Sequence, residues 1–265
     1  ETARGIYQRG SCFHQTRLGL FKMLYLEWGK PLFLYPLTKE GKNMNQVDTT
    51  FFEAAAAGEV AKVSAMIAAN AEVNVTNGEG RTALMRSAKR GYIQIVRILL
   101  DNGADVSLRD INGKTAIMGA AKKGHYDIVK MLIEAGAKAN VQDNKGRSAL
   151  MRAAFLGYSD VCDLLIKNGA DVNAHDDEGR TALMEACNAC NVETIKVLLG
   201  AGANINAKDD HGCTALMRVA YSGYKELVEY LLAQGADKEI MDNANRKAIH
   251  YVRRENFEDL KEDLK

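Results

Sequence analysis

Apolar positions between residues 146 and 173 fall into two short runs with helical spacing. The first run predicts a helix from Ser148 to Gly157, and the second predicts a helix from Ser159 to Gly169. Serine suits the N-cap position, and glycine commonly ends a helix. The apolar positions of the two runs are Ala149, Leu150, Met151, Ala153, Ala154, Val161, Leu164, Leu165 and Ile166. Two helices of this length cannot bury a core alone, so the unit must stack on others.

The same pattern recurs every 33 residues. A threonine or serine, with glycine two residues before it and Ala-Leu-Met or Ala-Ile-Met after it, stands at Thr82, Thr115, Ser148, Thr181 and Thr214. Each unit continues through a Gly-Ala pair to an aspartate, at Asp110, Asp143, Asp176, Asp209 and Asp242. A fixed period of this length predicts a solenoid, in which each unit buries its apolar face against its neighbours.

The pattern extends past both ends in a degenerate form, as expected for terminal repeats that must present one polar face to water. Residues 44–265 are therefore predicted to form one repeat domain of seven units. The units are an N-terminal capping repeat at 44–79, full repeats at 80–112, 113–145, 146–178, 179–211 and 212–244, and a C-terminal capping repeat at 245–265.

Recurring residues within the unit each have a physical role. The threonine hydroxyl can accept from free N–H groups of the first helical turn, which stabilises a helix by roughly 1 kcal/mol. An acidic residue in the first turn of the second helix is favoured by the helix dipole. Such residues are Asp127, Asp160, Glu193 and Glu226. The Asn, Asp and Gly residues between units predict a tight hairpin.

The unit, with its Gly-x-Thr-Ala-Leu, Gly-Ala-Asp-Val-Asn and Asp-x-x-Gly motifs, resembles the ankyrin repeat over about residues 45–265. The resemblance implies an all-α ankyrin-repeat solenoid of stacked helix-turn-helix units with short β-hairpin loops. The family's Thr-Pro-Leu-His reads Thr-Ala-Leu-Met here, and only His250 keeps the family's histidine. Methionine replaces the histidine that bridges repeats, so we expect thioethers to pack repeat to repeat. They are Met85, Met118, Met151, Met184 and Met217.

Residues 1–43 differ in kind, being basic, rich in aromatic residues and home to the only tryptophan, Trp28. They hold seven Lys/Arg and three acidic residues, against 28 and 31 in the rest of the chain. Two interpretations remain open. The segment precedes a natural start at Met44, or it is the tail of a longer natural chain that packs on the first repeat. A helix is conceivable at 18–28, but we expect low order.

The five cysteines are odd in number and show no repeated spacing, which is typical of reduced thiols in the cytoplasm. A secreted effector stays open. Cys187 and Cys190 could begin a zinc or redox site, but Cys187 takes an alanine core position and Cys190 takes the glycine turn position. The next candidate ligands, His211 and Cys213, lie ~12 Å away at the far end of a helix. No metal or cofactor is expected.

Catalysis is not predicted either. His125 stands at a turn position held by tyrosine in other repeats, and no Gly-rich phosphate loop occurs. No apolar run reaches the length of a membrane span, because three charged residues interrupt the most apolar run, at 18–37. The net charge of +1 favours no class of partner.

In ankyrin proteins, ligands usually lie in a concave groove made by hairpin tips and the exposed side of the first helices. Carried over to this chain, the groove has a charge gradient with an apolar anchor at Phe155 and Leu156, one repeat after Lys122 and Lys123. The candidate partner-binding residues are Arg81, Arg86, Lys89, Arg90, Lys114, Lys122, Lys123, Arg147, Arg152, Phe155, Leu156, Asp177, Glu178 and Tyr221, with Arg109, Lys145 and Glu185 on the same surface. A merely solvated charged face is the alternative.

The resemblance thus implies a monomeric, non-catalytic protein–protein interaction module, a scaffold or adaptor. Its partner segment would carry acidic residues and an apolar side chain. One alternative is the recognition part of a larger enzyme, effector or regulatory protein. A second is nucleic-acid binding through the basic early repeats. We disfavour it because the repeat region is net acidic and has no aromatic platform among its basic residues.

Overall fold

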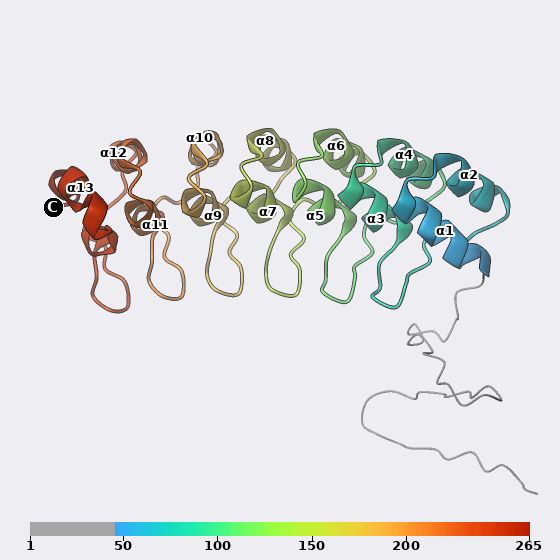
Figure 1. Ribbon diagram of the computed structural model, residues 1–265, viewed down its shortest axis with the longest axis horizontal. Helices are drawn as coiled ribbons and strands as arrows, with labels where there is room; N and C mark the ends of the chain where they lie inside the picture. Colours follow the sequence, from blue (N-terminus) through green and yellow to red (C-terminus); the bar gives the residue numbers. More distant parts are fainter. Residues whose placement is uncertain (1–45) are drawn as a thin grey trace, which may run out of the picture. The chain divides into compact units, whose positions relative to one another are not determined.

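The computed structural model describes residues 46–265, which form six helix pairs followed by a shorter C-terminal unit (Figure 1). The first helices of the pairs are α1 (Gln46–Ala57), α3 (Ala83–Arg90), α5 (Ala116–Ala121), α7 (Ala149–Phe155), α9 (Ala182–Asn188) and α11 (Ala215–Ser222). The second helices are α2 (Val60–Ala68), α4 (Ile93–Asp101), α6 (Tyr126–Glu134), α8 (Ser159–Lys167), α10 (Val192–Gly200) and α12 (Lys225–Ala233). Chain contacts separate Met44–Lys265 from Glu1–Asn43. The unit Glu1–Asn43, which includes the helix considered at 18–28, lies outside the described residues.

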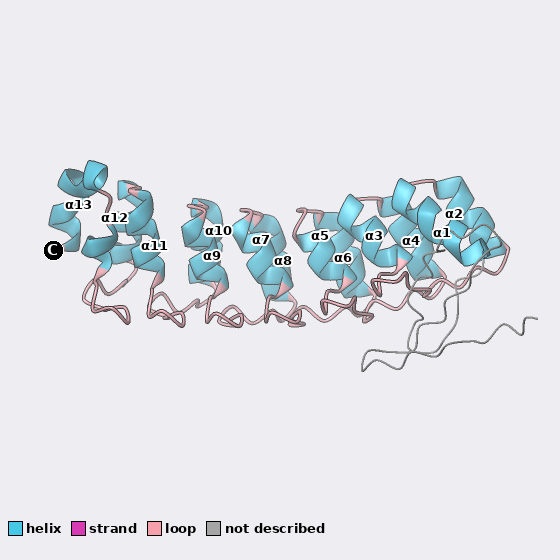
Figure 2. Ribbon diagram, turned by 60° about the horizontal axis from the view of Figure 1, so that its bottom comes forward, coloured by secondary structure: helices cyan, strands magenta, loops and turns pink. Residues whose placement is uncertain are grey.

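The repeats stack in one row, with the first helices in one layer and the second helices in the other (Figure 1). Each first helix contacts the first helix of the next repeat, from α1 through α11 to the C-terminal unit. The loops between repeats project along a single edge (Figure 2). This arrangement confirms the predicted fold class, an all-α solenoid of stacked helix pairs.

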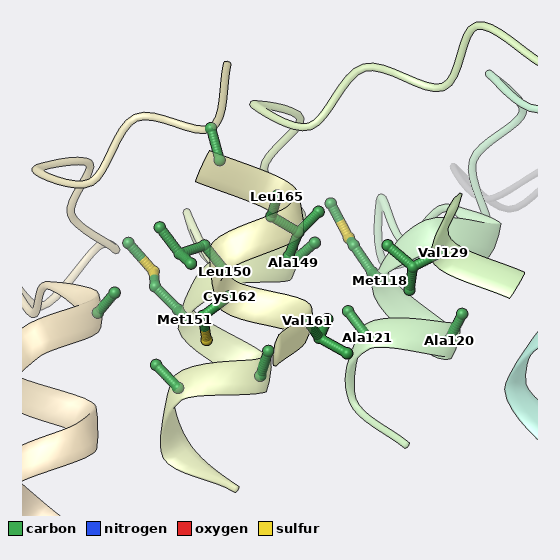
Figure 3. Close-up of a cluster of buried hydrophobic side chains, with 14 of the residues drawn as sticks. Met118, Ala120, Ala121, Val129, Ala149, Leu150, Met151, Val161, Cys162 and Leu165 are labelled. Atoms are coloured by element: carbon green, nitrogen blue, oxygen red, sulfur yellow. The ribbon is translucent and has the colours of Figure 1, made fainter. Parts of the chain in front are cut away.

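The core is built from the recurring Ala-Leu-Met positions and the leucines of the second helices. Met118 and Met151 are each 1% exposed. Figure 3 shows the thioether of Met118 between its own helix and Ala149 and Leu165 of the next repeat. Burying a methionine side chain stabilises the fold by about 1.5–3 kcal/mol. The methionines thus pack repeat to repeat, as the sequence predicts.

Threonine and serine caps form at four of the five predicted positions. In α3, α7, α9 and α11 the hydroxyl accepts a hydrogen bond from the backbone N–H three residues later. The pairs are Thr82 with Met85 at 3.2 Å, Ser148 with Met151 at 3.3 Å, Thr181 with Met184 at 3.3 Å and Thr214 with Met217 at 3.5 Å. The exception is Thr115, whose buried hydroxyl makes no cap bond to α5 and has no partner among the described residues. The prediction of a cap is wrong there.

Left-handed residues end the first helices, because only that backbone conformation reverses the chain within one residue. Gly91 has φ 84° and Gly157 has φ 79°. Cys190, at the equivalent position, has φ 54°. A non-glycine residue in this region is uncommon, so the assignment of Cys190 to the glycine turn is confirmed.

The C-terminal unit departs from the helix pair. Its first helix is a single 3₁₀ turn, η1 (Ala248–Tyr251), followed by η2 (Arg254–Asn256) and α13 (Phe257–Leu264). His250 is exposed, and its Nδ1 accepts from the N–H of Lys247 at 3.0 Å. The one histidine that follows the family's pattern therefore caps its own turn.

Neighbouring loops are joined along the edge by backbone hydrogen bonds. The N–H of Ile111 donates to the carbonyl of Glu79 at 3.1 Å, and the same bond recurs at each later loop up to Asn243. Single β-bridges close three loops, at Thr76–Thr82, Gln142–Ser148 and His175–Thr181. Among residues 46–265, the expected hairpins are tight turns with at most one bridge. Each loop thereby holds its neighbour in place.

Candidate partner-binding surface

Two exposed positions recur at the ends of the five first helices from α3 to α11. We call them the end row, and its ten residues are Lys89, Arg90, Lys122, Lys123, Phe155, Leu156, Asn188, Ala189, Tyr221 and Ser222. The row runs from basic through apolar to polar and aromatic. Phe155 and Leu156 are each 41% exposed although they are large and apolar. Tyr221 is 54% exposed, and the guanidinium of Arg253 lies 4.3 Å from its ring centroid.

Buried aspartates organise the loops that precede the first helices, at the opposite end of these helices from the end row (Figure 2). One oxygen of Asp143 accepts the N–H groups of Lys145 and Arg147, at 2.9 and 3.0 Å, while the other meets the guanidinium of Arg152. Asp209 accepts in the same way and pairs with Arg218 at 2.5 Å. An arginine of the first helix therefore holds the carboxylate that shapes the preceding loop.

In the repeat between these two, the loop aspartate is Asp176, and its carboxylate is held by an arginine of its own loop. Burial alone would raise the pKa of Asp176, but the hydrogen bonds from the side chain and N–H of Arg180 and from the N–H of Glu178 lower it overall. Arg180 Nη2 lies 2.9 Å from Asp176 Oδ2. Asp176 thus stays ionised without an arginine from the helix.

The sequence places five arginines among the partner-binding residues, and four of them, all except Arg90, have an acidic partner within the chain. Arg152 pairs with Asp143, and Arg147 pairs with Glu185 at 3.0 Å. Arg81 pairs with Glu79 and lies 3.5 Å from Asp110, and Arg86 lies 3.7 Å from Glu79. Their positive charge is partly neutralised, so they contribute less to the gradient than the sequence predicts.

Glu185 is not an exposed acid of the groove. It is 6% exposed and lies between Arg147, at 3.0 Å, and Arg180, at 3.6 Å. The expectation that Glu185 lies on the groove surface, which came from the resemblance to ankyrin proteins, is therefore wrong. Asp177 and Glu178 are exposed, and Glu178 pairs with Arg180 at 2.9 Å.

Five of the predicted cations have no ion pair with any described residue. They are Lys89, Arg90, Lys114, Lys122 and Lys123. Partial burial, followed by the charges of Arg81 and Lys122, lowers the pKa of Lys89. Partial burial, followed by the charges of Arg152 and Lys114, lowers the pKa of Lys122. These cations repel one another, and an anion placed between them would relieve that repulsion.

Cys187 and Cys190 lie where the sequence places them. Cys187 is buried in α9 at the alanine position, and burial raises the pKa of its thiol. Burial likewise raises the pKa of Cys162 to about 12. Within residues 46–265, no three His, Cys, Asp or Glu side chains converge on a point where a metal ion could bind. No helix in that range is long and apolar enough to cross a membrane.

Comparison with known sequences bears directly on this architecture. A family profile described as "Ankyrin repeats (3 copies)" matches residues 102–176 and 150–242, and another, "Ankyrin repeats (many copies)", matches residues 66–118. The chain belongs to the ankyrin repeat family. Ankyrin repeats generally mediate protein–protein interaction, and the fold is typically a non-catalytic binding module.

Solved structures agree on the fold of this ankyrin array. The crystal structure of the human ASB11 ankyrin repeat domain superimposes with a TM-score of 0.73 at 24% sequence identity. The match covers 80% of this chain and 96% of that one. At this identity the likeness shows the fold alone. No curated protein sequence matches the chain.

Sequence reasoning missed the ion pairs that hold the ankyrin loops. A signal was present: arginine follows the loop aspartate by nine residues in the pairs Asp143–Arg152 and Asp209–Arg218. Read as a partner pair, this spacing identifies those arginines as structural. It also draws attention to the repeat in which the same position is Gly119.

Proposed function

We propose that this ankyrin array is a non-catalytic scaffold or adaptor that binds an extended segment of another protein along the end row, the exposed side of the first helices and the loops that precede them. The partner segment carries acidic residues opposite the basic end of the row and an apolar side chain at Phe155 and Leu156. Free thiols at all four described cysteines support a reducing, cytoplasmic location. The array acts as a monomer.

The observation that carries the proposal is the exposure of Phe155 and Leu156 side by side, in a row whose other residues are charged, polar or small except for Tyr221. Complete burial of a large apolar side chain stabilises a protein by about 1.5–3 kcal/mol, and these two side chains, each 41% exposed, forgo part of that stabilisation. The fold does not need Phe155 at this position, since lysine occupies it one repeat earlier. Exposed aromatic side chains of this kind serve as anchors of interfaces.

The first test removes the anchor. The double variant Phe155→Ala with Leu156→Ala is compared with wild type in affinity capture from the native host, with bound proteins quantified by mass spectrometry. The matched control is Ile93→Ala with Tyr126→Ala, which removes two apolar side chains of similar exposure, 37% and 39%, from the second-helix layer. We expect a specific set of proteins to be lost with the first variant and kept with the control. Equal capture by both variants would reject the anchor.

The second test addresses the charges. Reversal of Lys89, Arg90, Lys122 and Lys123 to glutamate should slow association with a captured partner and weaken its salt dependence, because these cations steer an acidic segment. A double variant that reverses only Lys122 and Lys123 has a matched control in the reversal of Arg97 and Lys130, two cations that lie on second helices. Unchanged association rates in the quadruple variant would contradict the proposal.

Nucleic-acid binding is the second candidate, and the unpaired cations of the early repeats favour it. It predicts that a single-stranded oligonucleotide binds with a steep salt dependence and without help from Phe155. Fluorescence anisotropy of a labelled oligonucleotide at two salt concentrations separates the two candidates. Tight binding that the quadruple reversal abolishes and the Phe155 and Leu156 double variant leaves intact would favour this alternative.

A further inference from the structure

A hollow of about 110 Å³ opens on the groove side between α3 and α5. Its floor is Gly119, in the middle of α5. The equivalent positions of the other described repeats carry a long side chain, at Glu53, Arg86, Arg152, Glu185, Arg218 and Tyr251. The glycine therefore leaves space that a side chain fills in every neighbouring repeat. We call this space the Gly119 hollow.

Positive charge surrounds the hollow. Among its lining residues, Lys89, Lys114 and Lys122 have no ion pair with any described residue, and Arg152 closes one side. The only acidic lining residue is Asp110, whose carboxylate already accepts the N–H groups of Asn112 and Lys114 and lies 3.5 Å from Arg81. The hollow thus has an excess of cations that nothing in residues 46–265 neutralises.

A buried hydroxyl also lines the hollow. Thr115 is 5% exposed, and its Oγ1 has no hydrogen-bond partner among the described residues. The equivalent hydroxyls of Thr82, Thr181 and Thr214 cap their helices, whereas that of Thr115 does not. A buried hydroxyl without a partner is unfavourable. It can donate to an acceptor that enters the hollow.

We propose that the Gly119 hollow binds one oxyanion, the carboxylate or phosphate of a side chain on the partner segment. Lys89, Lys114 and Lys122 supply the charge, and the hydroxyl of Thr115 donates a hydrogen bond. The inference rests on the proposed function and names one subsite within it. The lowered pKa values of Lys89 and Lys122, caused first by partial burial and then by nearby cations, agree with a site that gains from an anion.

The test uses blocked tripeptides whose central residue is glutamate, phosphoserine or, as the uncharged control, glutamine. Each is titrated into the full chain and followed by backbone amide chemical shifts in two-dimensional NMR. We expect saturable shifts confined to the residues around the hollow, in α3 and at 114–122, with glutamate or phosphoserine, and none with glutamine. The stronger of the two charged peptides identifies the source of the oxyanion. Shifts spread evenly along the end row would overturn the proposal.

Gly119→Arg distinguishes binding inside the hollow from general attraction of an anion to the positive surface. The variant adds a cation but fills the hollow, so we expect the affinity for the charged peptide to fall at least tenfold. Asn188→Arg adds the same charge on the end row without filling the hollow, and should leave that affinity within twofold of wild type. Binding by Gly119→Arg that equals or exceeds wild type would overturn the pocket.

Gly119→Arg could also disturb folding, because a Cβ at Gly119 would lie 3.2 Å from Cβ of Lys89. A second variant is therefore needed. Lys114→Gln with Lys122→Gln avoids that contact and should also weaken binding at least tenfold. If the Phe155 and Leu156 double variant loses partners but the wild-type chain binds no charged peptide at the Gly119 hollow, the subsite is rejected and the proposed function stands. If the chain binds a charged peptide but the double variant loses no partner, the proposed binding of a partner segment at Phe155 and Leu156 is rejected instead.

Discussion

The clearest test of the fold energetics is a pair of identical substitutions, Thr115→Val and Thr181→Val. The two threonines are nearly equally buried, at 5% and 6% exposed, and stand one residue before α5 and α9. Thr181 accepts the N–H of Met184 at 3.3 Å, whereas Thr115 accepts no such bond. Valine has nearly the shape of threonine and replaces the hydroxyl with a methyl group.

The two substitutions should have different effects on the free energy of unfolding. Loss of an N-cap costs about 1 kcal/mol, because the first-turn N–H groups lose their acceptor. Thr181→Val should therefore lower the free energy of unfolding by about 1 kcal/mol. At Thr115 no bond is lost, and removing a buried hydroxyl without a partner should leave stability unchanged or raise it by up to about 1 kcal/mol.

Thermal and urea unfolding followed by far-ultraviolet circular dichroism measure this difference. About 1 kcal/mol corresponds to ~2–4 °C in Tm for an array of this size. Because repeat arrays can unfold in parts, hydrogen exchange of the amides of α5 and α9 should accompany the melts. If Thr115→Val loses as much stability as Thr181→Val, then the hydroxyl caps α5 and is not free to bind an anion.

Three further predictions follow from buried groups. Glu185→Leu leaves the partly exposed Arg147 without its carboxylate, whereas Arg180 keeps Asp176 and Glu178, so the variant should cost about 1 kcal/mol in urea unfolding; an unchanged free energy of unfolding would contradict the pairing. The Tyr251 hydroxyl donates to Asp242 at 2.5 Å and lowers the pKa of that carboxyl. This stabilisation is present above pH 3.8 and lost as the pH falls further, so the Tm deficit of Tyr251→Phe should shrink in acid. Cys162, with its raised pKa and buried thiol, should resist alkylation at pH 8 until the protein is denatured, as peptide mass mapping would show; rapid labelling of the native protein would argue against burial.

Much of the fold could be predicted because its determinants are local. The left-handed turn at Gly157, the cap at Ser148 and the acidic first turn at Asp160 depend on residues within one helical turn. Their recurrence every 33 residues establishes the repeat. Even Cys190 could be placed in its turn, because its neighbours in the period are glycines.

The candidate surface was predictable only in part. Exposure of Phe155 and Leu156 follows from their place in the period, as does that of Lys122 and Lys123. The pairing of arginines does not follow, because an ion pair depends on where two long side chains meet in space. Glu185 shows the difference, since its bonds to Arg147 and Arg180 join residues from two repeats.

The sequence by itself determined the repeat, its period, the helix limits and the apolar positions that stack, since these depend on the backbone preferences and hydrophobicity of single residues. Only the tertiary structure decided which charges remain without a partner and where space is left between repeats. Gly119 reads in the sequence as a weak helix residue. Between its neighbours it becomes the floor of a cationic hollow, because Lys89, Lys114 and Lys122 meet around it only when the repeats are stacked.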